Sequence, residues 1–599
     1  MSFRNAYQAW LDSAALSPEE KEELRGIAND PKEIESRFFD QLSFGTAGLR
    51  GTMCTGLHQM NIHVIRHTTQ AFAEVVKEEG TAACRQGVAI CFDCRNHSAE
   101  FAREAACVMA ANDIQVRLFE SMRPTPELSF AVRKYGCKAG INVTASHNPK
   151  EYNGYKVYWE DGAQLPPKHA DAIAAKMKEL DVFASVRRMD YEAALAVGKI
   201  TLLGAETDEA FLAEVMGLVN DRACVARVAD RFSLVYTPFH GTGYQLIPEA
   251  LKRLGMKHVL CVPEQMVIDG DFPTVASPNP ENAESFALAE ELAKAHSCDL
   301  IVGSDPDADR VGVMVRNATG TYEVLSGNQT GVLLLDYLIG AKKRAGTLPD
   351  NAYANTTIVT TQMVDKICAV NGIHTARTFT GFKFLAEKKD ALEKNGAGKV
   401  FFSFEESFGY MLGDYVRDKD AVTAIVLIVE MAAWYADQGK TLYDALQDCY
   451  AKYGYYGEKT VNLVMPGLDG MARMAAIMKR LHDAPLTEVA GTPVTLQKDY
   501  LTGQMTVPGQ AAEPMELKDS DVVAYDLAGQ HLYHPPLGNG AENQGLYPSQ
   551  RSRSGGMSDE GAEVCCFCRY HSSTCTLNHT ETASAISNRV ALTVFCFLC

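Results

Sequence analysis

The chain has 599 residues, too many for one hydrophobic core and enough for several domains of ordinary size. Its 46% hydrophobic and 22% charged residues are typical of a soluble globular protein. The formal net charge of −18 argues against nucleic acid or an anionic membrane as a partner, because both attract basic surfaces. An anionic substrate would therefore need a local basic cluster.

The N-terminal segment and the cysteines indicate where the protein works. Residues 1–5 contain no apolar signal core, and the sequence has no run of about 20 apolar residues that could span a membrane. Most of the 17 cysteines are scattered singly, as in a reduced cytosolic protein, although six crowd the last 35 residues. We therefore expect a cytoplasmic protein with no membrane partner.

Strand-like runs alternate with helical patterns from about residue 60 to residue 440, which predicts α/β layers. The predicted strands are residues 87–92, 116–119, 234–236, 258–260, 357–359 and 400–402. The predicted helices are residues 98–112, 244–254, 362–371 and 382–394, and a long helix after Asp420. Ser98 is expected to cap the first of these helices.

Domain boundaries are predicted near residues 205, 325 and 450. Residues 1–205 would hold an N-terminal helical extension and a first α/β domain, residues 206–325 a second and residues 326–450 a third. The strand signal restarts at residues 461–464, so residues 451–530 would form part of a smaller α+β domain. Residues 531–599 are expected to be a disordered, aberrant tail.

A serine hydroxyl lies just beyond a predicted strand. Ser146 stands in residues 144–150, directly after an apolar run at residues 141–143. A Ser-His-Asn protease is disfavoured, since neighbouring residues rarely form a nucleophile–base dyad and the Gly-x-Ser-x-Gly elbow is missing. An ordinary turn serine is one alternative, and a carrier of a phosphoryl group facing a metal is the other.

Three alternating aspartates follow another predicted strand. Asp305, Asp307 and Asp309 can converge on one hard cation through oxygen atoms. An EF-hand loop is excluded because Arg310 stands at its sixth position and Arg316 at its twelfth. A loop that is phosphorylated at its first aspartate would want Thr or Val in place of Asp309, while solvated turn acids remain an alternative. Together with the serine, this cluster indicates phosphoryl transfer through the enzyme.

Other patterns are weaker when they are taken alone. The glycine-rich residues 45–51 and 241–243 could let backbone N–H groups approach a phosphate. Arg310 could hold a phosphoryl oxygen bidentately. Residues 405–407, Glu-Glu-Ser, could accept hydrogen bonds from sugar hydroxyls or could be solvated acids, and Lys419 could bind a phosphate or be a surface charge.

In this order, the patterns resemble the α-D-phosphohexomutase superfamily of phosphoglucomutases and phosphomannomutases, over roughly residues 40 to 530. Residues 44–51, 144–158, 270–274 and 405–407 are most similar to its branch of phosphoglucomutase and phosphopentomutase enzymes. The resemblance implies three successive α/β domains with mixed sheets and a smaller α+β fourth domain, incomplete here, around a central cleft.

The resemblance also implies an activity, a cofactor and site residues. Ser146 would carry the phosphoryl group, and Asp305, Asp307 and Asp309, with the phosphate on Ser146, would hold one Mg²⁺ per subunit. The remaining implied site residues are His147, Lys156, Arg50 and Arg310 at the reacting end and Thr380, Gly381, Glu405, Ser407 and Lys419 for binding the substrate. The reaction would interconvert glucose 1-phosphate and glucose 6-phosphate, small phosphosugars, with glucose 1,6-bisphosphate as intermediate and activator. Phosphomannomutase or phosphopentomutase activity is the alternative, and His147 and Lys156 are the candidate bases.

The C-terminal tail departs from the family. An Arg-Pro-Ser-Gly-Thr-Glu-Pro-Lys-like loop, which would hold the non-reacting phosphate, is absent, and residues 531–547 stand in its place. The residues from Pro535 onward can be encoded by codons that, when translation starts one base later, read Arg-Pro-Ser-Gly-Thr-Glu-Pro-Lys. We hypothesise a single-base frameshift near Gln530 or His531. The alternative function is then a catalytically impaired sugar-phosphate-binding homologue. If the tail is out of frame, two of its patterns were not selected for function: the zinc-like Cys565, Cys566, Cys568, His571 and Cys575, and the prenylation-like residues 596–599.

Overall fold

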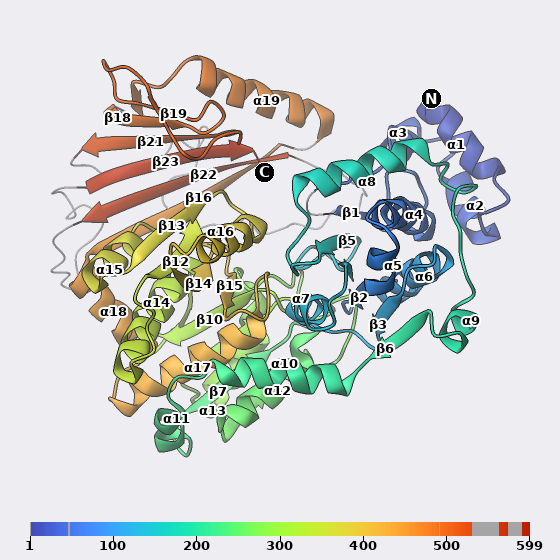
Figure 1. The fold of residues 1–599 in the computed structure, drawn as a ribbon. Helices are drawn as coiled ribbons and strands as arrows, with labels where there is room; N and C mark the ends of the chain where they lie inside the picture. The colour runs from blue at the N-terminus through green and yellow to red at the C-terminus, as the bar shows by residue number, and fades with distance from the viewer. Residues whose placement is uncertain are drawn as a thin grey trace. The chain divides into compact units, whose positions relative to one another are not determined.

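The computed structural model describes residues 2–45, 48–465, 467–489, 491–529, 562–572 and 590–598 (Figure 1). The chain divides into two compact units. The first comprises Met1–Thr357, Asn371–Arg377 and Gly381–Ala445, and the second comprises Ile358–Val370, Thr378–Thr380 and Leu446–Cys599.

Three helices begin the first unit: α1 (Phe3–Asp12), α2 (Pro18–Gly26) and α3 (Pro31–Phe38). Ser17 and Glu20 form a capping box at α2, so the hydroxyl and the carboxylate each satisfy a backbone N–H that the helix leaves open. The rings of Trp10 and Phe38 pack edge to face with centroids 5.7 Å apart. This extension is helical, as its charged pattern predicts.

The first sheet contains β1 (Leu49–Thr52), β2 (Val88–Phe92), β3 (Val116–Phe119), β4 (Ala139–Val143), β5 (Tyr152–Trp159) and β6 (Ile200–Leu203). Their order is β1-β5-β4-β2-β3-β6, with β5 antiparallel to both neighbours and the other pairs parallel. Its helices are α4 (Ile62–Glu78), α5 (Thr81–Gln86), α6 (Ser98–Ala111), α7 (Thr125–Lys134), α8 (Pro167–Glu179) and α9 (Tyr191–Ala196). Alternate residues of β2 enter opposite cores: Val88 packs with the α4 and α6 side, and Ala89 packs with the α7 side.

The second sheet contains β7 (Ser233–Thr237), β8 (His258–Cys261), β9 (Leu300–Ser304), β10 (Val311–Arg316) and β11 (Tyr322–Leu325), in the order β11-β10-β9-β7-β8. Strand β7 is parallel to β8 and β9, while β10 is antiparallel to β9 and β11. Its helices are α10 (Ala205–Gly217), α11 (Arg222–Val228), α12 (Gly243–Leu254), the 3-10 helix η1 (Ala283–Phe286) and α13 (Ala287–His296).

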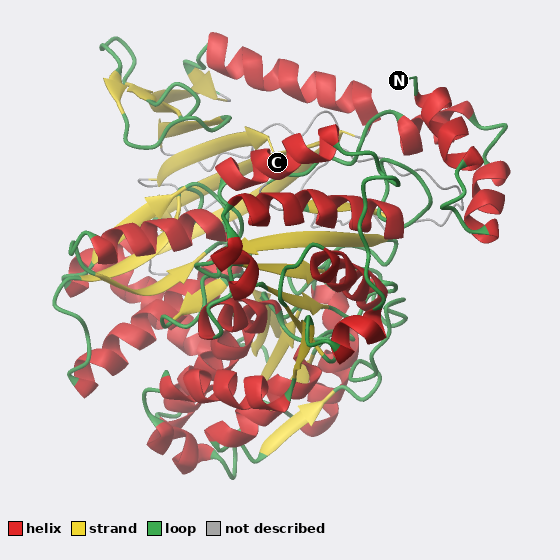
Figure 2. Cartoon of the chain, turned by 45° about the vertical axis from the view of Figure 1, so that its right-hand side comes forward, coloured by secondary structure: helices red, strands yellow, loops and turns green. Residues whose placement is uncertain are grey.

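The third sheet contains β12 (Ala352–Thr357), β13 (His374–Thr378), β14 (Lys399–Phe404) and β15 (Tyr410–Leu412), in the order β13-β12-β14-β15. Its helices are α14 (Gly327–Ala345), α16 (Phe382–Lys394) and α17 (Ala421–Asp437), while nearly all of α15 (Met363–Asn371) and most of α18 (Leu442–Tyr453) belong to the second unit. Figure 2 shows helices packed around the strands of these sheets. The prediction of three α/β domains with mixed sheets is confirmed.

Among the described residues, no single helix is long and apolar enough to cross a membrane, and only the bent pair α17 and α18 reaches that length and hydropathy together. Helix α17 is buried along most of its length and packs against α11 and α12. Its apolar character therefore fills the core of the first unit.

Two local predictions differ from the structure. The strand predicted at residues 357–359 lies at β12 (Ala352–Thr357), because the strand is built from small and polar residues whose apolar signal is weak. Ser98 is the first residue of α6 and does not cap it; its hydroxyl instead donates to Asp93 (2.7 Å).

The second unit contains β16 (Tyr455–Met465), β17 (Glu488–Val489), β18 (Thr492–Asp499), β19 (Gln504–Thr506), β20 (Glu513–Pro514), β21 (Val522–Gly529), β22 (Ala562–Ser572), β23 (Val590–Leu598) and α19 (Gly467–Asp483). The strand order is β16-β22-β23-β21-β18-β19-β20, with β17 paired to β18 (Figure 1, orange to red). Met478 of α19 packs against Val523 and Tyr525 of β21. The unit is thus an α+β layer.

The expectation that residues 531–599 lack structure is wrong for two segments. Strand β22 pairs with β16 and with β23, and β23 pairs with β21, all antiparallel. Residues 590–598 are rich in β-branched and aromatic residues, and residues 562–572 contain Val564, Phe567 and Tyr570; such residues favour strands whether or not they were selected for function. Residues 531–547, which stand where the resemblance leads us to expect the phosphate-binding loop, lie outside the described residues.

Candidate active site

The loop after β4 holds the predicted nucleophile. Ser146 is buried, and its backbone has a φ of +51°, in the left-handed region that a residue other than glycine adopts only when its surroundings impose it. The Thr144 hydroxyl accepts the Ser146 N–H (2.9 Å), and Ser146 Oγ lies 3.2 Å from His147 Nδ1. The hydroxyl is thus held at one place beyond the end of the strand.

Arg95, on the segment after β2, holds this loop through its guanidinium. The guanidinium donates to four loop carbonyls: those of Ser146 (2.6 Å), Asn148, Pro149 (2.8 Å) and Tyr152 (3.0 Å). Asp93 lies 3.4 Å from Arg95 Nε, and Arg95 also stacks over the ring of Phe272. Sequence reasoning missed Arg95, although Asp93-x-Arg95 at the end of a predicted strand was an available signal.

The loop between β9 and β10 places three buried carboxylates together. Asp305 Oδ1 accepts the backbone N–H groups of Asp309 (3.0 Å) and Arg310 (2.9 Å), which closes the loop on itself. Asp305 Oδ2 accepts a hydrogen bond from Ser146 Oγ at 2.6 Å. Asp305, Asp307 and Asp309 each offer an oxygen, and these oxygens lie within 4.8 Å of one another. The predicted serine and aspartates, from two different sheets, therefore meet.

These residues fit a hard divalent cation. Asp307 Oδ1 and Asp309 Oδ1 are buried and accept no hydrogen bond from any described residue. Burial and the charges of its two neighbours raise the pKa of Asp305. Burial is the largest influence on Asp307 and acts to raise its pKa as well, but the charge of Lys156 and the hydrogen bonds with Asp305, Lys156 and Thr125 together outweigh it and lower that pKa. A cation bound by oxygen would offset the crowded negative charge.

Two lysines approach the carboxylates. Lys156 Nζ, from β5, lies 2.8 Å from Asp307 Oδ2 and 3.7 Å from Asp309 Oδ2. Lys419 Nζ lies 3.1 Å from Asp309 Oδ2 and 3.1 Å from Asp418 Oδ1. Burial would lower the pKa of each lysine, but the neighbouring carboxylates outweigh it and raise both pKa values. Both ammonium groups are therefore charged near neutral pH.

The remaining predicted residues at the reacting end are His147 and two arginines. Arg50 donates to Asn148 Oδ1 (3.0 Å), and Arg310 Nη1 donates to Glu281 Oε1 (2.9 Å). Arg310 Nε is buried and has no hydrogen-bond partner among the described residues. Burial, together with the charges of Arg310 and Arg50, lowers the pKa of His147 well below its ordinary value. Its imidazole is neutral at pH 7 and can accept a proton.

The segment after β14 brings further predicted residues to the same region. Glu405 Oε1 accepts the backbone N–H of Gly381 (2.6 Å), and the Ser407 hydroxyl donates to Glu405 Oε2 (3.4 Å). Phe408 accepts the N–H of Val311 (3.0 Å), so this segment adjoins the aspartate loop. Burial, with the charge of Glu406, raises the pKa of Glu405 to about 7. Thr380 belongs to the second unit.

The two glycine-rich segments have backbone roles. A Cβ at Gly48 would lie 1.9 Å from the Tyr155 carbonyl oxygen, so only glycine lets β1 approach β5 there. A Cβ at Gly241 would lie 2.4 Å from Pro306 Cα, and the next residue, Thr242, donates its N–H to Pro306 (2.8 Å). Gly241 therefore packs against the aspartate loop. Thr46 and Ala47 lie outside the described residues.

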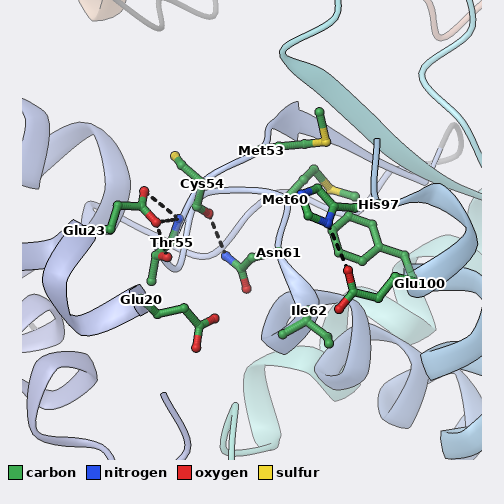
Figure 3. A pocket seen from close by; sticks show the side chains of 11 residues that line it. Glu20, Glu23, Met53, Cys54, Thr55, Met60, Asn61, Ile62, His97 and Glu100 are labelled. Carbon is green, nitrogen blue, oxygen red and sulfur yellow. Dashed lines mark hydrogen bonds and ion pairs between the residues drawn. The ribbon is translucent and has the colours of Figure 1, made fainter. Parts of the chain in front are cut away.

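A separate cavity of about 250 Å³ lies between α2, residues 53–62 and α6 (Figure 3). Its three acids already have partners. Glu23 accepts the Thr55 N–H (3.2 Å) and Glu100 lies 2.9 Å from His97, as Figure 3 shows, and Glu20 lies 2.9 Å from His63, which the figure does not draw. None of the predicted site residues lines this cavity. The Ser146–aspartate cluster is therefore the candidate active site.

Comparisons with known proteins match three consecutive family models. Models of phosphoglucomutase/phosphomannomutase α/β/α domains I, II and III match residues 41–182, 214–320 and 326–453. A Staphylococcus epidermidis phosphoglucomutase is 34% identical over 469 residues, 78% of this chain and 82% of its own length. A Staphylococcus saprophyticus phosphoglucomutase is 31% identical over 477 residues, 79% of this chain and 84% of its own.

Solved structures share the fold at lower identity. A Paramecium parafusin (phosphoglucomutase) aligns with a TM-score of 0.59 at 17% identity, over 93% of this chain and 90% of that one. A phosphoglucomutase/phosphomannomutase family protein of Burkholderia thailandensis aligns with a TM-score of 0.58 at 16% identity, over 93% of each chain.

Proposed function

The chain belongs to the phosphoglucomutase/phosphomannomutase family, and we propose that it interconverts glucose 1-phosphate and glucose 6-phosphate through a phosphoserine and a bisphosphate. The observation that carries the proposal is the 2.6 Å hydrogen bond between Ser146 Oγ and Asp305 Oδ2. It places a nucleophilic oxygen against a carboxylate cluster that fits a divalent cation. The names of the Staphylococcus relatives support glucose phosphates as substrates.

Asp305, Asp307 and Asp309 would hold Mg²⁺ together with the phosphate on Ser146. Bound there, the ion would offset charge on the transferring phosphoryl group. Arg50, Arg310, Lys156 and Lys419 supply fixed positive charge around the same point, so the protein positions the group and stabilises its charge.

The reaction has two halves. In the first, the bond between Ser146 Oγ and phosphorus breaks, and a free sugar hydroxyl takes the phosphoryl group, which produces glucose 1,6-bisphosphate. In the second, the reoriented bisphosphate returns its other phosphoryl group to Ser146. Of the two candidate bases, His147 fits better, because its imidazole is neutral whereas Lys156 is paired with carboxylates and charged.

Substrate selection would come from the third-sheet segment. We assign Glu405 and Ser407 to the sugar hydroxyls, with Thr380, Gly381 and Lys419 completing the contact to the phosphosugar. Mannose or pentose phosphates are the alternative substrates, since hydroxyl stereochemistry decides between them. We expect the enzyme to work in the cytoplasm on small free metabolites.

The rival is a sugar-phosphate-binding homologue that turns over poorly. It is favoured by the absence of an Arg-Pro-Ser-Gly-Thr-Glu-Pro-Lys-like loop from the sequence. Without this loop nothing would bind the non-reacting phosphate, so the bisphosphate would not be held in the correct orientation once it has turned around.

Coupled assays with glucose, mannose and pentose 1-phosphates test the proposal. Wild-type protein should convert glucose 1-phosphate fastest and should carry a phosphoserine detectable by mass spectrometry. Ser146→Ala should lose both the turnover and the phosphoserine. Turnover by Ser146→Ala at the wild-type rate would contradict the assignment of Ser146 as the phosphorylated residue. Binding of glucose 6-phosphate in calorimetry, without turnover, would favour the rival.

A further inference from the structure

The N-terminal end of α7 contacts the aspartate loop through one residue. The backbone N–H of Thr125 donates to the carbonyl oxygen of Asp307 (2.8 Å), and the Thr125 hydroxyl donates to Asp307 Oδ2 (2.8 Å). Helix α7 covers the first sheet, whereas Asp307 follows β9 of the second sheet. Thr125 therefore connects the two domains at the candidate metal site.

The direction of the Thr125 hydroxyl is fixed by a third residue. Asn142 Nδ2, from β4, lies 2.7 Å from Thr125 Oγ1. A carboxylate can only accept, so the hydroxyl hydrogen points to Asp307 and the hydroxyl oxygen accepts from the amide. All three side chains are fully buried, where a hydrogen bond is not exchanged with water.

The two oxygens of Asp307 are thereby made different. Oδ2 accepts from Thr125 and from Lys156 (2.8 Å), whereas Oδ1 has no partner among the described residues. An ammonium carries three donors on a flexible stem and also approaches Asp309, so it sets little direction by itself. The hydroxyl, held from both sides, fixes the rotation of the carboxylate.

We propose that Thr125 is a positioning residue that holds Asp307 with one oxygen turned to the divalent cation, oriented in turn by Asn142. This rests on the proposed function of the aspartate loop as a metal site. Groups that orient metal ligands from outside the coordination shell commonly change metal affinity 10- to 100-fold when they are removed. A residue that only docks α7 onto the loop would change the unfolding temperature and leave metal affinity alone.

The test compares Thr125→Val, which removes the hydroxyl at nearly constant volume, with Thr125→Ser, which keeps it. Thr69→Val is the matched control, because Thr69 is equally buried and its hydroxyl bonds Ile65 and Tyr155 in the same domain. The dissociation constants of Mg²⁺ and Mn²⁺ are measured by calorimetry and Mn²⁺ paramagnetic resonance, on full-length metal-free protein without substrate. Thermal unfolding of each variant is recorded in parallel.

Thr125→Val should bind both ions about tenfold or more weakly, whereas Thr125→Ser and Thr69→Val should stay within about threefold of the wild type. Asn142→Ala, a second variant that leaves Thr125 in place, should weaken binding by a smaller factor. Wild-type affinity in a folded Thr125→Val would overturn the proposal even if the enzyme is an active mutase. Conversely, weakened binding by Thr125→Val in a protein without mutase activity would uphold it and contradict the proposed function. A wild type that binds neither ion would overturn both.

Discussion

The guanidinium of Arg95 lies 2.6 Å from the carbonyl oxygen of Ser146, whose backbone is held in the left-handed region. The same guanidinium reaches three more carbonyls of the loop. A planar fork with five donors can satisfy such a set, and a lysine ammonium cannot. The conformation of the loop that contains Ser146 is therefore held by a residue about fifty positions earlier in the chain.

Arg95→Lys should lower kcat by about tenfold or more, because a loosened loop misplaces the hydroxyl. Hydrogen exchange over residues 144–152 should become faster, which separates a local effect from global unfolding. Arg117→Lys is the control, since Arg117 bonds a single carbonyl of the same domain, that of Gln86. Unchanged exchange and unchanged kcat in Arg95→Lys would contradict the role given to Arg95.

The raised pKa of Glu405, about 7, predicts a pH dependence of stability. A carboxyl whose pKa is raised on folding binds its proton more tightly in the folded protein than in the unfolded chain. Its favourable contribution is complete below about pH 4.5 and falls as the pH rises through about 7. Glu405→Gln, which keeps an acceptor for the Gly381 N–H, should remove this fall.

Denaturant unfolding of wild type and Glu405→Gln at pH 4.5 and pH 8 measures the effect. The wild type should lose free energy of unfolding relative to Glu405→Gln over this interval, and the exposed Glu387→Gln should follow the wild type. Parallel curves for all three proteins would show that Glu405 is ionised normally.

Restoring the shifted reading frame after residue 530 should raise kcat/KM for glucose 1-phosphate by about 10²-fold or more, because the new loop would bind the non-reacting phosphate. The control is the restored chain with its loop arginine and lysine changed to alanine. Equal activity of the chain as written and the restored chain would contradict the hypothesis. Codons at the locus that cannot encode the loop in any frame would also end it.

The loops of the candidate active site could be predicted because each directly follows a strand. Ser146 and the aspartates stand one to five residues beyond β4 and β9, so local pattern places them at a sheet edge. That they meet was expected from the pairing of the two motifs and from the family resemblance, whereas local spacing alone does not show how two separate sheets pack. The shared contact at Asp305 became visible only in the structure.

Arg95 and Thr125 escaped prediction for a related reason. Each acts through hydrogen bonds to groups that lie about 50 to 180 positions away in sequence, and no local pattern marks such partners. Strands β22 and β23 escaped for another reason. A segment that is read out of frame was not selected for structure, and we therefore expected disorder. Whether a segment pairs into a sheet depends on its residues, however, and the composition of these two segments permits pairing.

The hydrogen bond between Ser146 and Asp305 determines how the proposed catalytic cycle begins. In the unmodified chain the Ser146 hydroxyl donates its hydrogen to Asp305, and this hydrogen bond partly offsets the negative charge of the carboxylate. Phosphorylation removes that proton and sets two further negative charges beside the same carboxylate. Under the proposed mechanism, a newly synthesised chain would be inactive until a phosphate donor phosphorylates Ser146 and a cation offsets the added charge.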